Sequence, residues 1–317
     1  MSKSDTTLTV SSGGMRLDQY LGDSAHCRSR SEALSLIKAG RVKLNGTKCL
    51  KASASVKAGD RLELSLPSPP PVQDSDAKQV ALPVLYEDAT CMVIDKPAGI
   101  IVHPGHGMKP GDTTILSALT PLFRKRDLPF HPASVLVHRL DKDTTGCLLI
   151  AKTPEAHIAL QKQFAGREVR KTYLALVAGL PSPAAAVIDS PIGRHKHHRT
   201  RMSVMDASSK LREAKTTYRT LSHGKNAALL ACDLHTGRTH QLRVHLSTIG
   251  HPILGDETYG TDRSKTMAEE SGIERICLHA WKFSFTSLKH KRVEVESPLP
   301  GNFMKALELS EIRWTLT

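Results

Sequence analysis

The sequence predicts an α+β protein of two domains, the second of which contains a mostly antiparallel sheet. Three observations support this prediction. Near the N-terminus, apolar residues at helical spacing are followed by short alternating segments. A Pro-rich polar stretch then interrupts the chain, and short apolar runs bounded by turn residues dominate the remainder. Scattered helices in a strand-rich sequence, without a regular strand–helix alternation, are typical of α+β folds.

The first domain is predicted over residues 15–66. The preceding Ser/Thr/Gly-rich stretch, residues 1–14, is expected to be a frayed tail. Apolar residues at i, i+3 and i+4 predict a helix around residues 16–21. Ser29 and Glu32 at capping-box spacing, with Gly40 as the C-terminal cap, predict a second helix over residues 30–39. The residues expected to face inward from the second helix are Ala33, Leu34 and Ile37.

Two alternating segments, residues 41–44 and 62–66, predict strands after these helices. The first ends at Asn45-Gly46, a strong signal for a tight turn. Several basic residues lie close together here, at a helix start and on the following strand, where they suit contact with a phosphate backbone. The predicted RNA-binding residues of this domain are Arg28, Arg30, Lys38, Arg41 and Lys43. A solvated basic face is the alternative interpretation.

The same region resembles a known RNA-binding domain. It contains the pieces R-L-D-x-x-L, S-R-S-x-A, I-x-x-G-x-V-x-x-N-G and a late G-D in the correct order. In this pattern residues 15–66 are similar to the S4 RNA-binding domain. The Pro-rich segment, residues 67–79, is expected to be a semi-rigid linker, and residues 80–317 the second domain.

The second domain is predicted from a series of apolar runs. Thr153 followed by Pro154 predicts a helix start that leads to a helix ending near Gly166. Helical spacing predicts another helix around residues 242–249. Strands are predicted at residues 91–94, 171–177, 216–221 and 227–234, and within 276–295.

The most informative stretch is residues 136–152. Apolar runs at 135–137 and 147–151 predict two strands, and the residues between them predict a polar loop. A loop held between two strands is a common place for catalytic residues. An ordinary charged hairpin loop in solvent is the alternative interpretation.

The overall composition indicates a polyanionic partner. Lys and Arg total 44 against 31 acidic residues, a net charge of +13. Nucleic acid is the simplest such partner, and an anionic membrane surface is the competing one. No apolar run has the length of a membrane span, and the N-terminus lacks a signal-peptide core. Six scattered cysteines without a Cys-x-x-Cys pair favour a cytoplasmic protein with free thiols.

Several chemistries find no support in the sequence. The histidines have no stringent metal-binding spacing, and the cluster at 195–198 lies among cations that repel a metal ion. A phosphate-contacting role suits this loop better, with Arg194, Lys196, Arg199 and Arg201 as predicted RNA-binding residues. Nucleotide-binding glycine loops are absent, so a nucleotide cofactor is not expected.

Two carboxylates, Asp141 and Asp143, are two residues apart. In an extended segment they would point the same way, about 7 Å apart, as a glycosidase pair requires. Arg139 and Lys142 in the same loop would keep these carboxylates ionised. An ionised carboxylate is a poor general acid but a usable nucleophile.

The loop sequence H-R-L-D-K-D-T-T-G-C-L-L-I-A-K, residues 138–152, resembles the H-R-L-D-x-x-T-S-G-L-L-x-x-A-K signature of RluA-family pseudouridine synthases. Thr145 and Cys147 are mild departures from it. The K-T-Y-L-A strand (171–175), the segments G-R-T-H-Q-L-R-V-H (237–245) and P-I-L-G-D, and K-P-A-G (96–99) are similar to further family motifs. With the S4 domain in front, the architecture resembles the large-subunit rRNA enzymes of the RluD/RluC type.

This resemblance implies the isomerisation of RNA uridine to pseudouridine without a metal or cofactor. It implies that Asp141 is the essential carboxylate and that Tyr173 stacks on the uracil or acts through its hydroxyl. Arg243 is the preferred cation beside Asp141, with Arg238, also a predicted RNA-binding residue, second. Arg139 is the candidate that fills the gap left by the target base. The implied core is a mixed sheet in two halves flanking an RNA cleft.

The expected protein is a monomer that acts on RNA, most simply 23S rRNA. A tRNA target, or a non-catalytic RNA-binding or ribosome-assembly protein, is the alternative.

Overall fold

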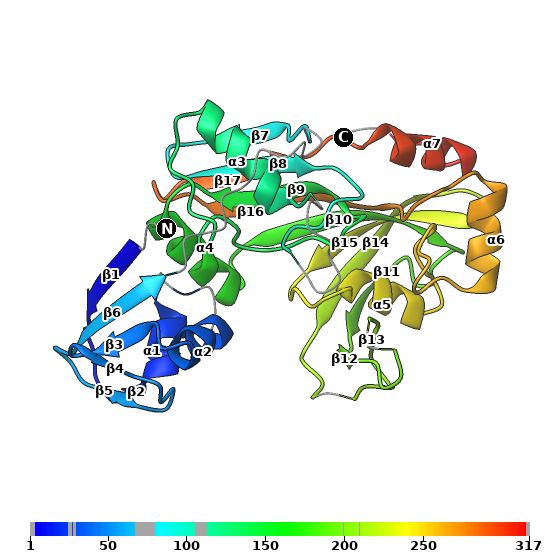
Figure 1. The fold of residues 1–317 in the computed structure, drawn as a ribbon. Helices are drawn as coiled ribbons and strands as arrows, with labels where there is room; N and C mark the ends of the chain where they lie inside the picture. The colour runs from blue at the N-terminus through cyan, green and yellow to red at the C-terminus, as the bar shows by residue number, and fades with distance from the viewer. Residues whose placement is uncertain are drawn as a thin grey trace.

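The computed structural model describes residues 4–24, 27, 30–66, 80–104, 113–198, 200–208 and 210–314. These residues form a small N-terminal unit with two helices and a larger unit built on a long sheet (Figure 1). The predicted linker, residues 67–79, and the predicted RNA-binding residues Arg28 and Arg199 lie outside the described residues. Across the described ranges, no helix is long and apolar enough to cross a membrane.

The N-terminal unit confirms the predicted helices and strands. Its helices are α1 (Leu17–Asp23) and α2 (Arg30–Lys38). Its main sheet has the order β1-β6-β3-β4, formed by Ser4–Thr9, Arg61–Leu66, Val42–Leu44 and Thr47–Lys48, and a two-stranded sheet pairs β2 (Met15–Arg16) with β5 (Ser55–Val56). Asn45 and Gly46 both have positive φ, as the predicted tight turn requires.

Two predictions for this unit are wrong. The segment predicted as a tail contains β1, which pairs antiparallel with β6 and places Leu8 opposite Leu62. Threonine favours strands because of its branched β-carbon, and this preference outweighs the polarity of the segment. On α2 the fully buried apolar positions include Leu36, whereas Leu34 is only half-buried.

The larger unit contains a nine-stranded sheet of order β11-β14-β15-β10-β16-β9-β8-β7, with β17 paired to β16. Every pairing is antiparallel except that of β16 with β9. The predicted mixed, mostly antiparallel sheet is therefore confirmed. The strands are β7 (Val84–Glu87), β8 (Cys91–Lys96), β9 (Thr145–Ala151), β10 (Arg170–Ala178), β11 (Ala185–Asp189), β14 (Lys215–His223), β15 (Ala227–Leu234), β16 (Leu278–Thr286) and β17 (Arg292–Glu296).

Strand β16 joins the two halves of this sheet. One edge of β16 pairs with β10, and the other edge pairs with β9 and β17. The parallel contact with β9 is short and places Ala280 opposite Gly146. Gly146 has a φ of +106°, and a β-carbon there would overlap the carbonyl oxygen of Ala280. Glycine is therefore required where the two halves meet.

Substitution of this glycine tests the junction. We expect Gly146→Ala to lower the free energy of unfolding by about 3 kcal/mol or more, since it adds backbone strain and forces β9 away from β16. Gly46→Ala is the matched control: φ there is +80°, but the β-carbon would meet open space. Its expected cost is about 1 kcal/mol. Urea unfolding of both variants compares the two costs, and equal values would contradict the close approach.

Helices flank the sheet (Figure 1). The predicted α4 (Pro154–Ala165) begins after Thr153, whose side chain accepts a hydrogen bond from the Ala156 amide, and α5 (Gln241–Thr248) is also confirmed. Three helices were not predicted, among them the strongly polar α6. They are α3 (Ile115–Lys125), α6 (Asp262–Glu270) and α7 (Gly301–Leu309). The basic loop contains a short ribbon of β12 (Gly193–Arg194) and β13 (Met202–Ser203).

The predicted strand at residues 135–137 is wrong. These residues are buried, but their regular pairing is limited to a single bridge between Leu136 and Ile150. The Ala151 amide also donates to the carbonyl oxygen of Val135. A three-residue apolar run can be buried by side-chain packing alone, so its hydrophobicity does not by itself predict a strand. The polar loop is therefore held on one side by β9 and on the other by an irregular buried segment.

Candidate active site

A pocket of about 230 Å³ lies where the polar loop, β10 and the segment after β15 meet. Asp141 is the only carboxylate among its lining residues. Three further predicted site residues line it as well: Arg139, Tyr173 and Arg238. The other lining residues are His138, Leu140, Thr144, Phe164, Lys171, Leu234, Gly237, Thr239, His240, Gln241 and Leu278.

Arg243 connects Asp141 to a second, buried carboxylate. Its Nε and Nη2 donate to the two oxygens of Asp256 at 2.7 and 2.8 Å, and its Nη1 lies 3.5 Å from Oδ2 of Asp141. The Asp256 side chain is 1 % exposed and that of Asp141 is 20 % exposed. Burial alone would lower the pKa of Arg243, but the hydrogen bonds to Asp256 raise it overall. The guanidinium is thus a fixed positive charge beside Asp141.

The predicted extended geometry of Asp141 and Asp143 is wrong. Residues 142 and 143 form a turn, and the Thr144 amide donates to the carbonyl oxygen of Asp141 at 3.3 Å. Asp143 is exposed and does not line the pocket. Two carboxylates facing one ligand, as a glycosidase needs, are therefore not found among the residues lining this pocket.

A fully buried lysine holds this turn. Nζ of Lys96 donates to the carbonyl oxygens of Pro97, Lys142 and Thr144 at 2.8, 2.8 and 2.9 Å. Burial lowers the pKa of Lys96 to about 8, although the nearby Asp143 and Asp141 oppose this shift. All three ammonium hydrogens are used, so the backbone on both sides of Asp143 is fixed.

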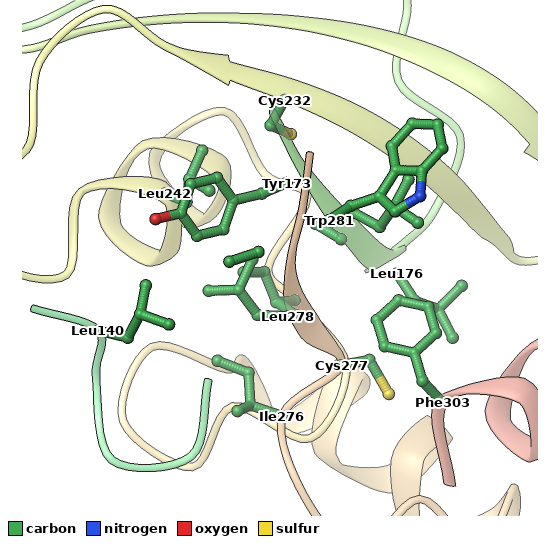
Figure 2. Packing of buried hydrophobic residues seen from close by; sticks show 14 of the residues in the cluster. Leu140, Tyr173, Leu176, Cys232, Leu242, Ile276, Cys277, Leu278, Trp281 and Phe303 are labelled. Carbon is green, nitrogen blue, oxygen red and sulfur yellow. The ribbon is translucent and has the colours of Figure 1, made fainter. Parts of the chain in front are cut away.

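Tyr173 forms part of the apolar floor of the pocket. Its ring is 8 % exposed and lies near Leu140 and Leu278 (Figure 2). Burial raises the pKa of the phenol, and the negative charge of Asp141 raises it further. The hydroxyl therefore stays protonated at neutral pH, and the ring offers a flat surface on which a planar base can stack.

His138 supports the loop rather than presenting a reactive group. Its Nε2 accepts a hydrogen bond from the Leu149 amide at 2.9 Å. The ring is stacked on Phe164 and Phe283, with centroids 4.9 and 5.2 Å away. Burial lowers its pKa to about 3, so the imidazole is neutral. These contacts agree with the structural role predicted for it.

Two residues behind the pocket were not given roles from the sequence: Asp256 and Tyr259. The Tyr259 ring lies 5.0 Å from the Arg243 guanidinium carbon. Its hydroxyl accepts from the Met202 amide and is hydrogen-bonded to Nδ1 of His240, both at 2.8 Å. Tyr259 thus connects strand β13 of the basic ribbon to the arginine beside Asp141. Asp256 could have been sought from the sequence, since a buried arginine such as Arg243 requires a carboxylate partner.

The predicted RNA-binding residues occupy different environments. Arg30 is paired with the buried Asp18 at 2.9 Å, and Lys43 is paired with Glu63 at 3.2 Å. Arg201 is half-buried in the ribbon. Arg30 and Lys43 are exposed all the same, as are Lys38, Arg41, Arg194 and Lys196. Their contact with RNA stays a prediction.

The chain is similar to known proteins over most of its length. Residues 90–248 match the RNA pseudouridylate synthase family, and residues 15–62 match the S4 domain. "Ribosomal large subunit pseudouridine synthase D" of Nitrosomonas europaea is 38 % identical over 96 % of this chain and 87 % of that protein. The protein of the same name from Pseudomonas aeruginosa is 39 % identical over 94 % and 92 %.

A solved structure, "Human RNA Pseudouridylate Synthase Domain Containing 4", is also similar. It is 28 % identical, with a TM-score of 0.59, over 73 % of this chain and 94 % of that one.

Proposed function

Because the chain belongs to the RNA pseudouridylate synthase family, we propose that it converts specific uridines of large-subunit rRNA to pseudouridine. Family membership makes the chain an isomerase that acts on RNA. The choice of rRNA rests on the S4 domain and on relatives named as large-subunit enzymes. We further propose a cytoplasmic monomer that needs no nucleotide cofactor.

The observation that carries the proposal is the placement of Asp141. It is the single carboxylate of the pocket, and Arg243 lies beside it with a charge fixed by Asp256. In the proposed reaction the N1–C1′ bond breaks and a C5–C1′ bond forms. The C5 hydrogen leaves as a proton and N1 takes up a proton, so that no atoms or electrons are gained or lost. The Asp141 carboxylate initiates this exchange, and Arg243 lies beside it and orients it.

The target uridine must leave its stack to reach Asp141. We propose that its base stacks on the ring of Tyr173 and that Arg139 occupies the position it vacates. The exposure of Arg139 at the pocket supports this role, since its side chain is free to enter the RNA helix. We expect the predicted basic residues of the S4 domain and of the ribbon to contact the RNA backbone.

Tritium release tests the function. Formation of pseudouridine expels the hydrogen at C5, so RNA transcribed with [5-³H]uridine loses label to water. We expect release from unmodified large-subunit rRNA and none from tRNA transcripts. Release from tRNA alone would mean that the substrate is tRNA rather than large-subunit rRNA. Binding of both RNAs without release from either would support a non-catalytic RNA-binding protein instead.

Lys96 gives a second test of the site. We expect Lys96→Met to reduce the rate of tritium release at least tenfold and to cost about 3 kcal/mol of stability, because three carbonyl oxygens lose their donor. The rate of the folded enzyme and urea unfolding measure the two effects separately.

Lys152→Met is the matched control for Lys96. Lys152 is also buried, but its Nζ binds Glu87 and the carbonyl oxygen of Asp88 and makes no contact with the loop. We expect this variant to lose stability while the folded enzyme keeps its rate. Equal rate losses in both variants would mean that Lys96 has no specific role in positioning Asp141.

A further inference from the structure

Lys171 places a third cation in the pocket, besides Arg139 and Arg238. It lies on β10, two residues before Tyr173, and both side chains line the pocket. Its Nζ lies over the Phe164 ring, 5.7 Å from the centroid. No carboxylate in the described ranges forms an ion pair with it. Burial lowers the pKa of Lys171 to about 8.

Further cations continue from Lys171 to the surface. Gly237, which lies beside the Lys171 ammonium, precedes Arg238. Burial lowers the pKa of Arg238, and so do the positive charges of Arg212 and Arg167. One carboxylate, that of Glu213, lies among these guanidinium groups and binds Arg167 at 2.8 Å. Glu213 thus pairs with Arg167 and faces Arg238, and the cluster of Arg167, Arg238 and Arg212 lies next to an ammonium that no described carboxylate pairs.

This arrangement is unfavourable in the free protein. A desolvated ammonium without a counter-ion is costly, and like charges held close together repel. An anion that enters the pocket would remove both costs. A polyanion with regularly spaced charges fits best, because the cations lead from the half-buried Lys171 and Arg238 to the exposed Arg212 and Arg167.

We propose that Lys171 binds the phosphate next to the flipped uridine, and that Arg238, Arg212 and Arg167 bind the following phosphates of the same strand. This inference rests on the proposed function, since it requires an RNA strand at the pocket. It separates the roles of two neighbouring residues on β10. Tyr173 contacts the base, whereas Lys171 contacts the backbone and holds the nucleotide at the depth that Asp141 needs.

RNA affinity provides the first test. With unmodified large-subunit rRNA transcript as the probe, we expect Lys171→Met to weaken binding about tenfold, as loss of a charge-assisted phosphate contact implies. The slope of log affinity against log salt concentration should fall by about 0.9. Lys171→Arg should retain most of the affinity and the slope.

Lys282→Met is the matched control for the binding measurements. Lys282 lies on the neighbouring strand β16, where its charge is balanced by Glu296 at 3.5 Å. We expect its replacement to leave RNA affinity and the salt slope unchanged. An equal loss in Lys282→Met would mean that the effect of Lys171→Met reflects net charge rather than a phosphate site.

The melting temperature of the RNA-free protein distinguishes a phosphate-binding role of Lys171 from a structural one. Because Lys171 is unpaired and partly desolvated, Lys171→Met should leave the melting temperature of the RNA-free protein unchanged or raise it. A clear decrease in melting temperature would mean that Lys171 stabilises the fold, and would overturn the proposal.

Proton uptake distinguishes a phosphate from other partners. A phosphate beside Lys171 raises its pKa above the free-state value of about 8, so RNA binding at pH 8.5 should take up part of a proton. Affinity should accordingly fall as the pH rises through 8 to 9. Titration calorimetry in two buffers of different ionisation enthalpy measures this uptake. Uptake that is present in wild type and absent in Lys171→Arg is assigned to Lys171.

The other titratable groups near Lys171 do not account for a difference in proton uptake between wild type and Lys171→Arg at pH 8 to 9. Burial keeps His138 and His240 neutral and raises the pKa of Tyr173. Helix α4 presents the uncharged Phe164. Lys96 also has a pKa of about 8, but it is present in wild type and Lys171→Arg alike. The remaining charged groups lining the pocket are Arg139, Asp141 and Arg238.

The outcomes separate this inference from the proposed function. Unchanged affinity, slope and proton uptake in Lys171→Met would overturn the phosphate site, even if tritium release is observed in wild type. If Lys171→Met loses tritium release but keeps the salt slope, Lys171 contacts the base rather than a phosphate. If Lys171→Met changes affinity, salt slope and proton uptake as expected but wild type releases no tritium, the proposed reaction is contradicted and the phosphate site is supported.

Discussion

Asp141→Asn is expected to reduce tritium release by about 1,000-fold or more and to change RNA affinity less than about threefold. The amide has the size of the carboxylate and can still accept a hydrogen bond from Nη1 of Arg243. It carries no negative charge and is a far weaker nucleophile or base, so the pocket stays intact while the reaction stops. Rate and affinity are measured on the same rRNA transcript.

Asp143→Asn is the matched control for this experiment. The residue lies in the same turn, is exposed, and does not line the pocket. We expect a nearly wild-type rate. A large loss of RNA affinity in Asp141→Asn would show that Asp141 maintains the structure of the pocket. Comparable rate losses in both variants would contradict a unique role for Asp141.

Arg243→Met is expected to have the second-largest effect, on both rate and stability. The substitution leaves the buried Asp256 without its ion-pair partner, at an expected cost of about 3–5 kcal/mol. It also removes the positive charge beside Asp141, so tritium release by the folded fraction should fall by at least about 100-fold. Urea unfolding and initial rates measure the two effects.

A double variant separates the two roles of Arg243. Oδ1 of Asp256 also accepts hydrogen bonds from the amides of Thr258 and Tyr259. An asparagine oxygen can keep these bonds without a buried charge, so Arg243→Met with Asp256→Asn should regain most of the lost stability. The rate should remain low. Recovery of the rate as well would mean that Arg243 only neutralises Asp256.

The part of the candidate site that lies within one short segment was predictable from the sequence. Asp141 and Arg139 belong to one continuous motif, and β10 was predicted around Tyr173 from its apolar run. The partnership of Arg243 with Asp256 was not predictable, because it depends on how the turn after α5 folds back. Lys96 was visible in a motif, yet its role is to bind carbonyl oxygens of a loop 46 residues away.

The same distinction explains the fold predictions. The capping residue before α4 is a local signal, and it located the helix start correctly. β1 was mistaken for a tail because its partner β6 lies about sixty residues further along the chain. Residues 135–137 were mistaken for a strand because burial by packing and burial in a sheet produce the same apolar run.

The position of β16 between the two halves has a consequence for synthesis of the protein. The loop bearing Asp141 precedes β9, and Tyr173, which we propose stacks on the base, lies on β10. The strand that joins β9 to β10 follows them by about a hundred residues. During translation both strands leave the ribosome before their common neighbour exists. A nascent chain therefore has no assembled pocket, and we expect activity toward RNA only after almost the whole chain has been made.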